Sequence, residues 1–266
     1  MNRRWKATAA ALAAAFALHM PAVSASHIRV NGTLLSADQG WVDNGTSYIT
    51  LRAYTQLTDS TLTWDGQRAR LSGAGLDLEA QPGQLYVTAN RRPIYVDGGV
   101  RAEEGKLTLP LRTLAQASGA TLTWDAATGT AELRTGGTPP ASGHYNEEDL
   151  YWLSRVISAE SRGESLEGQI AVGNVVLNRV ASSQFPNTIR EVVFDRKNGV
   201  QFEPVSNGTI YDTPTDSSVL AAKLCLEGAS VVEDCLYFFA PALSKGTWIV
   251  QNRPYFTTIG CHRFYR

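Results

Sequence analysis

The chain has 266 residues, with 24 Lys and Arg against 25 Asp and Glu and a formal net charge of −1. This near-neutral charge argues against a nucleic-acid-binding protein, for which a basic surface is expected. The one long apolar stretch lies at the N-terminus and is too short and too rich in alanine for a confident membrane span.

Residues 1–25 have the pattern of a secretory signal. Three basic side chains fall within residues 3–6, an apolar segment covers 7–18, and small residues at 23–25 suit a signal peptidase. We therefore expect an exported protein with no membrane span after cleavage. Removal of this segment leaves the mature chain mildly acidic.

The segment 26–135 contains a duplication. Thr61–Asp65 recurs unchanged as Thr121–Asp125, and Leu51–Gln56 has its counterpart in Leu111–Gln116, sixty positions further on in both cases. Each copy predicts a strand and turn, a second strand, a short helix, and a strand that ends in Trp–Asp before a hairpin return. The sequence therefore predicts a small α+β domain of antiparallel sheet and short helices.

The repeated unit resembles the copper amine oxidase N-terminal-like domain, which occurs duplicated in exported bacterial proteins. The resemblance covers roughly residues 28–134 and rests on an Asn–Gly or Asp–Gly turn, a Leu–Arg helix start and the Trp–Asp strand end. The helices are expected near 52–58 and 112–118. We expect no copper site, because His27 is the only histidine near this half of the mature chain.

Trp64 and Trp124 end equivalent strands of the two copies. We expect both to be core residues that pack a helix against the sheet. Binding to the cell wall is the alternative role for them.

A Gly-, Pro- and Ser-rich linker is predicted over 136–145. The remaining residues, 146–266, are numerous enough to form one compact core.

Glu160 has an unusual position for an acidic residue. Leu150, Leu153 and Ile157 recur at helical spacing, and position 160 continues the same apolar stripe. A carboxyl group held among apolar neighbours is poorly solvated in its charged form, so its pKa rises and it can donate a proton near neutral pH. The alternative is a Glu at its helix end that faces water or pairs with Arg162.

The next helix is predicted over 167–180 and is apolar on nearly every side, which is typical of a helix at the centre of a domain. Ser165 can cap its N-terminus. Gly168 and Gly173 would let another element approach it closely. Glu160 is thus expected beside a buried helix, in a position suited to the floor of a cleft.

The C-terminal domain resembles the cell wall hydrolase family of the spore cortex-lytic enzyme type. The similar segments follow in order along the domain: Ala159–Glu164, Glu167–Gln169, Ala171–Val180, Phe185–Ile189, Gln201–Val205, Leu236–Phe239, Trp248–Arg253 and Thr258–Tyr265. The resemblance implies a lysozyme-like α+β fold, cleavage of peptidoglycan glycan strands, and Glu160 as the catalytic acid. The family's usual peptidoglycan-binding N-terminal domain is replaced here by the duplicated unit, so both spore-cortex lysis and vegetative wall turnover stay open.

The distribution of carboxylates favours a lytic transglycosylase. Such an enzyme can use one Glu, which protonates the glycosidic oxygen and then accepts a proton as the muramic acid 6-hydroxyl closes onto C1, whereas ordinary glycosidases need two carboxylates. The other acidic residues of the domain fall in turns, caps or loops and are expected to be solvated: Glu164, Glu167, Asp195, Glu203, Asp212 and Asp216. Glu203 is the best second carboxylate if the enzyme is instead a two-carboxylate muramidase or glucosaminidase.

Four further residues are candidates for substrate binding. Gln201 and Tyr211 lie on a predicted loop over 195–214 and suit either sugar hydroxyls or the loop's own backbone. Trp248 belongs to a set of aromatic residues in predicted strands, of which some are core and one or two stack on sugar rings. Arg253 suits a peptide or lactyl carboxylate, or an acidic neighbour in the protein.

The three cysteines lie near the C-terminus. Cys235 and Cys261 fall in two strand-like segments, so we expect them to form the one disulfide of an exported chain. Cys225 lies in a helical segment and should be a buried small hydrophobe. His262 is expected to have a structural hydrogen-bonding role.

Two other classes of protein are alternatives. A cysteine peptidase or amidase would use a thiol with His262, although adjacent residues of a strand point to opposite faces. A non-catalytic wall-binding protein would use the duplicated domain as its binder, with Glu160 inert. Clustered metal ligands and a phosphate-binding glycine loop are missing from the sequence. The leading prediction is a secreted, monomeric enzyme without metal or cofactor whose partner is peptidoglycan.

Overall fold

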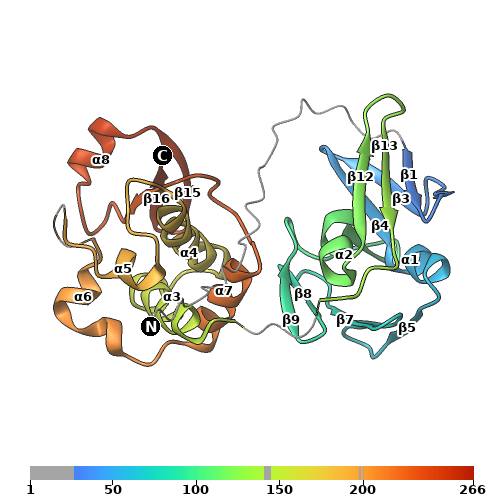
Figure 1. Ribbon diagram of the computed structural model, residues 1–266, viewed down its shortest axis with the longest axis horizontal. Coiled ribbons are helices and arrows are strands. Elements are labelled where there is room, and N and C mark those ends of the chain that lie inside the picture. The colour runs from blue at the N-terminus through green and yellow to red at the C-terminus, as the bar shows by residue number, and fades with distance from the viewer. Residues whose placement is uncertain (1–26, 141–144, 198, 200) are drawn as a thin grey trace, which may run out of the picture.

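The computed structural model describes residues 27–140, 145–197, 199 and 201–266. The expected signal segment and residues 141–144 of the expected linker lie outside the described residues. Two domains lie side by side (Figure 1), and both combine helices with strands, as the α+β prediction requires. Among the described residues, no helix is both long and apolar enough to cross a bilayer.

Sheets dominate the N-terminal domain. One sheet has the strand order β12 (Thr121–Asp125), β13 (Thr130–Arg134), β1 (His27–Val30) and β2 (Thr33–Leu34). A second has the order β10 (Arg101–Glu103), β11 (Lys106–Pro110), β4 (Thr46–Thr50) and β3 (Gly40–Asp43). A third is the meander β5 (Thr61–Trp64), β6 (Ala69–Gly73), β7 (Leu76–Ala80), β8 (Tyr86–Ala89) and β9 (Arg92–Tyr95). The helices α1 (Leu51–Leu57) and α2 (Leu111–Ser118) confirm the two predicted helices.

The duplication is visible as a local pseudo-twofold relation between β4 and β11. These strands pair antiparallel, and Ile49 lies opposite Leu109, its own counterpart sixty positions on. Each strand leads directly into the helix of its copy, so α1 and α2 start at equivalent points. Ile49, Leu109, Leu51 and Leu111 are all buried in one shared core. The two copies therefore fold as halves of one domain.

The expectation that both tryptophans are core residues is wrong for Trp64. Trp124 is partly buried and packs against the core cluster, but Trp64 is 55% exposed. The two hairpins have different neighbours, because β13 pairs with β1 whereas β6 pairs with β7. The two identical segments, Thr61–Asp65 and Thr121–Asp125, therefore lie in different surroundings.

Helices dominate the C-terminal domain. They are α3 (Glu147–Ser161), α4 (Leu166–Ala181), α5 (Ile189–Val193), α6 (Glu203–Asn207), the 3₁₀ turn η1 (Thr209–Tyr211), α7 (Asp216–Leu226) and α8 (Thr247–Asn252). A small antiparallel sheet has the order β14 (Tyr237–Phe239), β16 (His262–Tyr265) and β15 (Tyr255–Ile259). The predicted loop over 195–214 thus contains α6 and η1, and Trp248 lies on a helix rather than on a strand.

Helix α4 forms the centre of this domain, as its apolar sequence predicts. Ile170 and Val176 pack with α3, α5 and α7, while Ala171 and Val175 pack towards the sheet. The Ser165 side chain accepts a hydrogen bond from the backbone N–H of Gly168 and caps the helix, which satisfies one of its free N–H groups. The Asn146 side chain caps α3 in the same way, with acidic residues in the first turn that favour the helix dipole.

The expected disulfide between Cys235 and Cys261 is absent, and within the described chain Cys225, Cys235 and Cys261 are all free. The strand register gives the reason. Tyr237 lies opposite Tyr265, so Cys235 is beyond one end of β16, whereas Cys261 precedes its other end. Four intervening strand residues correspond to about 13 Å, while a disulfide requires Cα atoms within about 7 Å. Cys225 is buried in α7, as expected.

The close approach of α4 to its neighbours depends on Gly173. A Cβ at this position would lie 2.7 Å from Cys225 Sγ and 2.8 Å from Ile157 Cδ1. We predict that Gly173→Val lowers the free energy of unfolding by about 1–3 kcal/mol, because the core must shift to accept the side chain. Ala181→Val at the exposed end of the same helix is the control, with an effect within about 0.5 kcal/mol. Denaturant midpoints test this prediction, and equal losses in the two variants would contradict it.

Candidate active site

Glu160 lies near the end of α3 and is half-buried, with Leu153 and Ile157 of the same helix fully buried. Burial, with a smaller contribution from the charge of Glu203, raises the pKa of Glu160 to about 7, and the charge of Arg179 opposes the rise. The raised pKa predicted from the apolar stripe is confirmed. Arg162, the alternative partner, instead lies 3.8 Å from Asp212.

Arg179 is a buried cation of the site that the sequence pattern conceals, because it lies in the last turn of the otherwise apolar α4. Its side chain donates through Nε to the carbonyl of Leu236 at 2.8 Å and through Nη1 to Gln201 Oε1 at 3.3 Å. Burial lowers the pKa of Arg179 to about 10, while Tyr237, Asp195 and Glu160 act in the opposite direction. Arg179 therefore remains charged at neutral pH. The polar pair Asn178–Arg179 within the apolar run was the only sequence signal for it.

Gln201 lies in the segment before α6, and Glu203 lies in the first turn of this helix. Glu203 is exposed, as expected, yet its negative charge acts on Glu160. Gln201 accepts a hydrogen bond from Arg179, and its own amide donates to the carbonyl of Gly199 at 3.2 Å. The structure thus brings Glu160, Arg179, Gln201 and Glu203 into one electrostatic group.

An aromatic row extends from Arg179 to α8. The Arg179 guanidinium lies 5.7 Å from the Tyr237 ring centroid, and the Trp248 ring lies 5.9 Å from the same ring. Arg253 lies over both rings, 4.6 Å from Tyr237 and 5.2 Å from Trp248. Trp248 is 55% exposed, so much of its side chain can contact a ligand. Arg253 is thus engaged by aromatic rings rather than by the acidic neighbour considered from the sequence.

Tyr211 lies on η1, which packs against α3. It is exposed in η1, and its ring contacts that of Trp152, with centroids 6.2 Å apart. Asp212, which directly follows η1, lies 3.8 Å from Arg162, two residues after Glu160. Tyr211 therefore lies beside α3, and its chain segment reaches the end of that helix where Glu160 lies.

The expectation that Glu164 is solvated is wrong, since its side chain is only 13% exposed. Its carboxylate accepts a hydrogen bond from the Cys261 backbone N–H at 3.1 Å and lies 3.8 Å from His262 Nδ1. This carboxylate occupies the place where a Cβ at position 260 would lie, and Gly260 has φ +56°, so the position requires glycine. Glu164 therefore fixes the turn after Glu160 to the β15–β16 hairpin. His262 is buried, and burial lowers its pKa. Its Nδ1 has no hydrogen-bond partner in the part of the chain that the structure describes, so the expected hydrogen-bonding role is not seen at this nitrogen.

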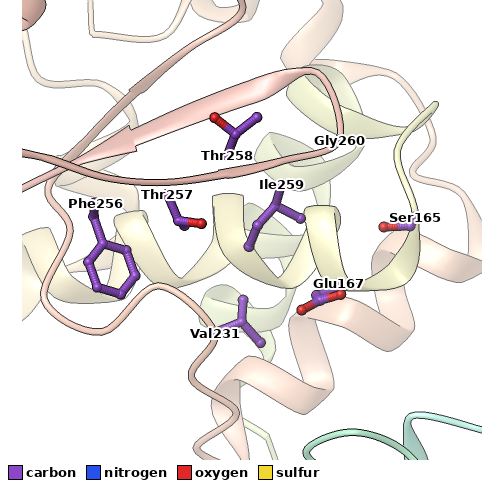
Figure 2. Close-up of a pocket in the computed structure, with 8 residues that line it drawn as sticks. All are labelled: Ser165, Glu167, Val231, Phe256, Thr257, Thr258, Ile259 and Gly260. Atoms are coloured by element: carbon purple, nitrogen blue, oxygen red, sulfur yellow. The ribbon is translucent and has the colours of Figure 1, made fainter.

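A pocket of about 640 Å³ lies beside this turn, between the start of α4 and β15 (Figure 2). Ser165 and Glu167 line one end, and Val231, Phe256 and Ile259 supply apolar side chains. The residues that line it do not include Glu160, Arg179 or Glu203, so the pocket is separate from the electrostatic group. Across the described chain, no group of three or more His, Cys, Asp or Glu side chains is arranged to hold a metal ion.

Two family models match the chain. The model described as Cell Wall Hydrolase matches residues 163–265, and the model described as Copper amine oxidase N-terminal domain matches residues 29–133. Both resemblances drawn from the motifs are confirmed at the level of the family. The first match begins three residues after Glu160, so it leaves the role of that residue open.

Curated relatives agree with the C-terminal match. A spore cortex-lytic enzyme of Bacillus cereus is 37% identical over 120 residues, which cover 45% of this chain and 45% of that protein. Cell wall hydrolase CwlJ of Oceanobacillus iheyensis is 32% identical over 103 residues, covering 36% of this chain and 72% of that protein. The chain spans about half the length of the cortex-lytic relatives. It belongs to the cell wall hydrolase family.

A solved structure is also similar. The catalytic domain of the germination-specific lytic transglycosylase SleB from Bacillus anthracis is 35% identical, and the match covers 47% of this chain and 98% of that one, with a TM-score of 0.43.

The raised pKa of Glu160 has a consequence for stability. The unfolded carboxyl loses its proton near pH 4.5, whereas the folded one keeps it to about pH 7. Between these values the folded state binds more protons, so stability falls as pH rises and the full cost, roughly 3 kcal/mol at most, is present above pH 7. We predict that Glu160→Gln raises the denaturant midpoint at pH 8 and that the difference from the wild type disappears near pH 4.

The control is Glu104→Gln, which removes a carboxylate from an exposed turn of the other domain. It should leave the midpoint nearly unchanged at both pH values. A wild-type advantage over Glu160→Gln at pH 8 would contradict the desolvation of Glu160.

Proposed function

We propose that this protein is a secreted enzyme that cleaves peptidoglycan between N-acetylmuramic acid and N-acetylglucosamine, as a lytic transglycosylase with Glu160 as its single proton-transfer group. The observation that carries the proposal is the pKa of about 7 at Glu160. Membership of the cell wall hydrolase family and the names of the cortex-lytic relatives support the substrate. Whether the enzyme acts in wall turnover or in cortex lysis depends on which type of peptidoglycan glycan strand it accepts.

Glu160 can act first as an acid and then as a base. Near pH 7 a substantial fraction of the carboxyl groups carries a proton, which can pass to the glycosidic oxygen as the bond breaks. The resulting carboxylate is stabilised by the charge of Arg179. It can then accept the proton of the muramic acid 6-hydroxyl as that oxygen closes onto C1 and forms an anhydro ring. A second carboxylate is not needed in this route.

The substrate side of the proposal rests on the aromatic row. Trp248 offers an exposed ring for stacking on a sugar, and Gln201 is held by Arg179 with its amide group in the same neighbourhood. Arg253 would attract the lactyl or peptide carboxylate of the strand while keeping its contact with Tyr237 and Trp248. Tyr211 would contact the strand from η1, beside α3.

A two-carboxylate hydrolase is the second candidate, and the electrostatic effect of Glu203 on Glu160 favours it. In that case Glu203 would activate a water molecule or attack the sugar directly, and the products would carry reducing ends.

Purified peptidoglycan strands and mass spectrometry of the products separate these possibilities. We predict that Glu160→Gln lowers the rate of cleavage by about 10²–10⁴-fold, because a general acid contributes about that much. The wild type should release 1,6-anhydro-muramic ends. Full activity of Glu160→Gln would refute the assignment of the acid.

Glu203→Gln is the matched variant. With one Glu, it should retain activity within about tenfold, well short of the loss of a general acid. Its pH optimum should move to lower values, because removal of a negative neighbour lowers the pKa of Glu160. A loss of activity comparable to that of Glu160→Gln, together with reducing ends, would instead identify the two-carboxylate hydrolase.

A further inference from the structure

The two domains are joined by a buried ion pair. Arg92 of β9 donates through Nε to Glu227 Oε1 at 3.0 Å and through Nη2 to Glu227 Oε2. The two side chains are only 9% and 10% exposed. Glu227 directly follows α7 as its C-terminal cap, so the cation also lies at the negative end of a helix. A two-point Arg–carboxylate contact of this kind fixes orientation as well as distance.

Two further side chains converge on Glu227. The Tyr145 hydroxyl donates to Glu227 Oε1 at 3.0 Å, and Gln116 of α2 donates through Nε2 to the Glu227 carbonyl at 2.6 Å. Tyr145 stands immediately before α3 and its cap. Glu227 therefore ties together a strand and a helix of the N-terminal domain and the segment that enters the C-terminal domain.

Apolar packing accompanies these polar contacts. Tyr86 and Tyr95, from β8 and β9, pack against the hydrophobic core of the C-terminal domain. Figure 1 shows β8 and β9 on the α7 side of that domain, with α6 and α8 on its other side. The contact thus leaves open the surface where Glu203 and Trp248 lie.

The second copy of the duplicated unit takes part through its helix. Gln116 is half-buried in the contact, whereas its counterpart Gln56 in α1 is exposed. The two copies are equivalent in fold but not in role, as expected if one of them serves a specific contact.

We propose that the repeated domain is a fixed brace of the cell wall hydrolase domain, locked to the end of α7 by Arg92 and Glu227, rather than a wall-binding module that moves freely on its linker. The brace supports the α3–α4–α7 core beneath Glu160. Asn174 of α4 extends it inward, because its amide donates to the Ala229 carbonyl at 2.7 Å and its Oδ1 accepts from the Val231 N–H at 2.8 Å. This proposal is independent of the reaction that the site catalyses.

The test uses the full-length chain. In Arg92→Met the Glu227 carboxylate is left buried without its cation, which is strongly unfavourable. We expect the melting temperature to fall by roughly 5–10 °C, unfolding in calorimetry to split into two transitions, and small-angle X-ray scattering to give a larger radius of gyration. The control Arg68→Met removes an exposed arginine of the same domain that pairs with Asp65 and Glu79, and it should change none of the three readouts.

A double variant keeps the test decisive if the single one folds poorly. Arg92→Met with Glu227→Met leaves no unpaired charge, so its loss of melting temperature should be smaller than the sum of the two single losses. If the losses of melting temperature were additive and the radius of gyration of the variants were unchanged, Arg92 and Glu227 would not lock the domains together. Wild-type scattering from separated domains would also overturn the proposal. None of these readouts requires glycan cleavage, so either outcome leaves the proposed function to be judged by its own experiment.

Discussion

Burial of α4 is the constraint on which the C-terminal domain depends. Because this helix is apolar on nearly every side, it can be stable only when α3, α5, α7 and the small sheet surround it. The contact at Gly173 then brings α3 and α7 close to it. Glu160 is placed by this packing, since it continues the face of α3 that the packing buries. Arg179 is buried for the same reason, as the last charged residue of the central helix.

The electrostatics of the site follow from that burial. Desolvation raises the pKa of Glu160, Glu203 reinforces the effect, and Arg179 limits it. The outcome is a carboxyl group that can both lose and regain a proton near neutral pH, the property that a one-carboxylate mechanism requires. Desolvation of Glu160 destabilises the folded state, and contacts elsewhere in the fold offset this loss. They include the Glu164 contact and the domain contact at Glu227.

Periodicity in the sequence was sufficient to predict what depends on local pattern. It located α3 and α4 and identified Glu160 from an apolar stripe, while the internal repeat located the paired helices of the duplicated domain. It failed where the outcome depends on contacts distant in sequence. The buried position of Arg179 could not be seen in the pattern of its apolar helix. The predicted Cys235–Cys261 disulfide did not take the strand register into account. The identical segments around Trp64 and Trp124 pack against different neighbours.

Glu160 holds a proton near neutral pH because it is desolvated. Carbon-13 NMR of the Glu side-chain carboxyl groups in the full-length protein measures this directly, with the resonance assigned through Glu160→Gln. We predict a titration midpoint of about 7. A midpoint near 4.5, the ordinary value for a glutamic acid, would contradict the account.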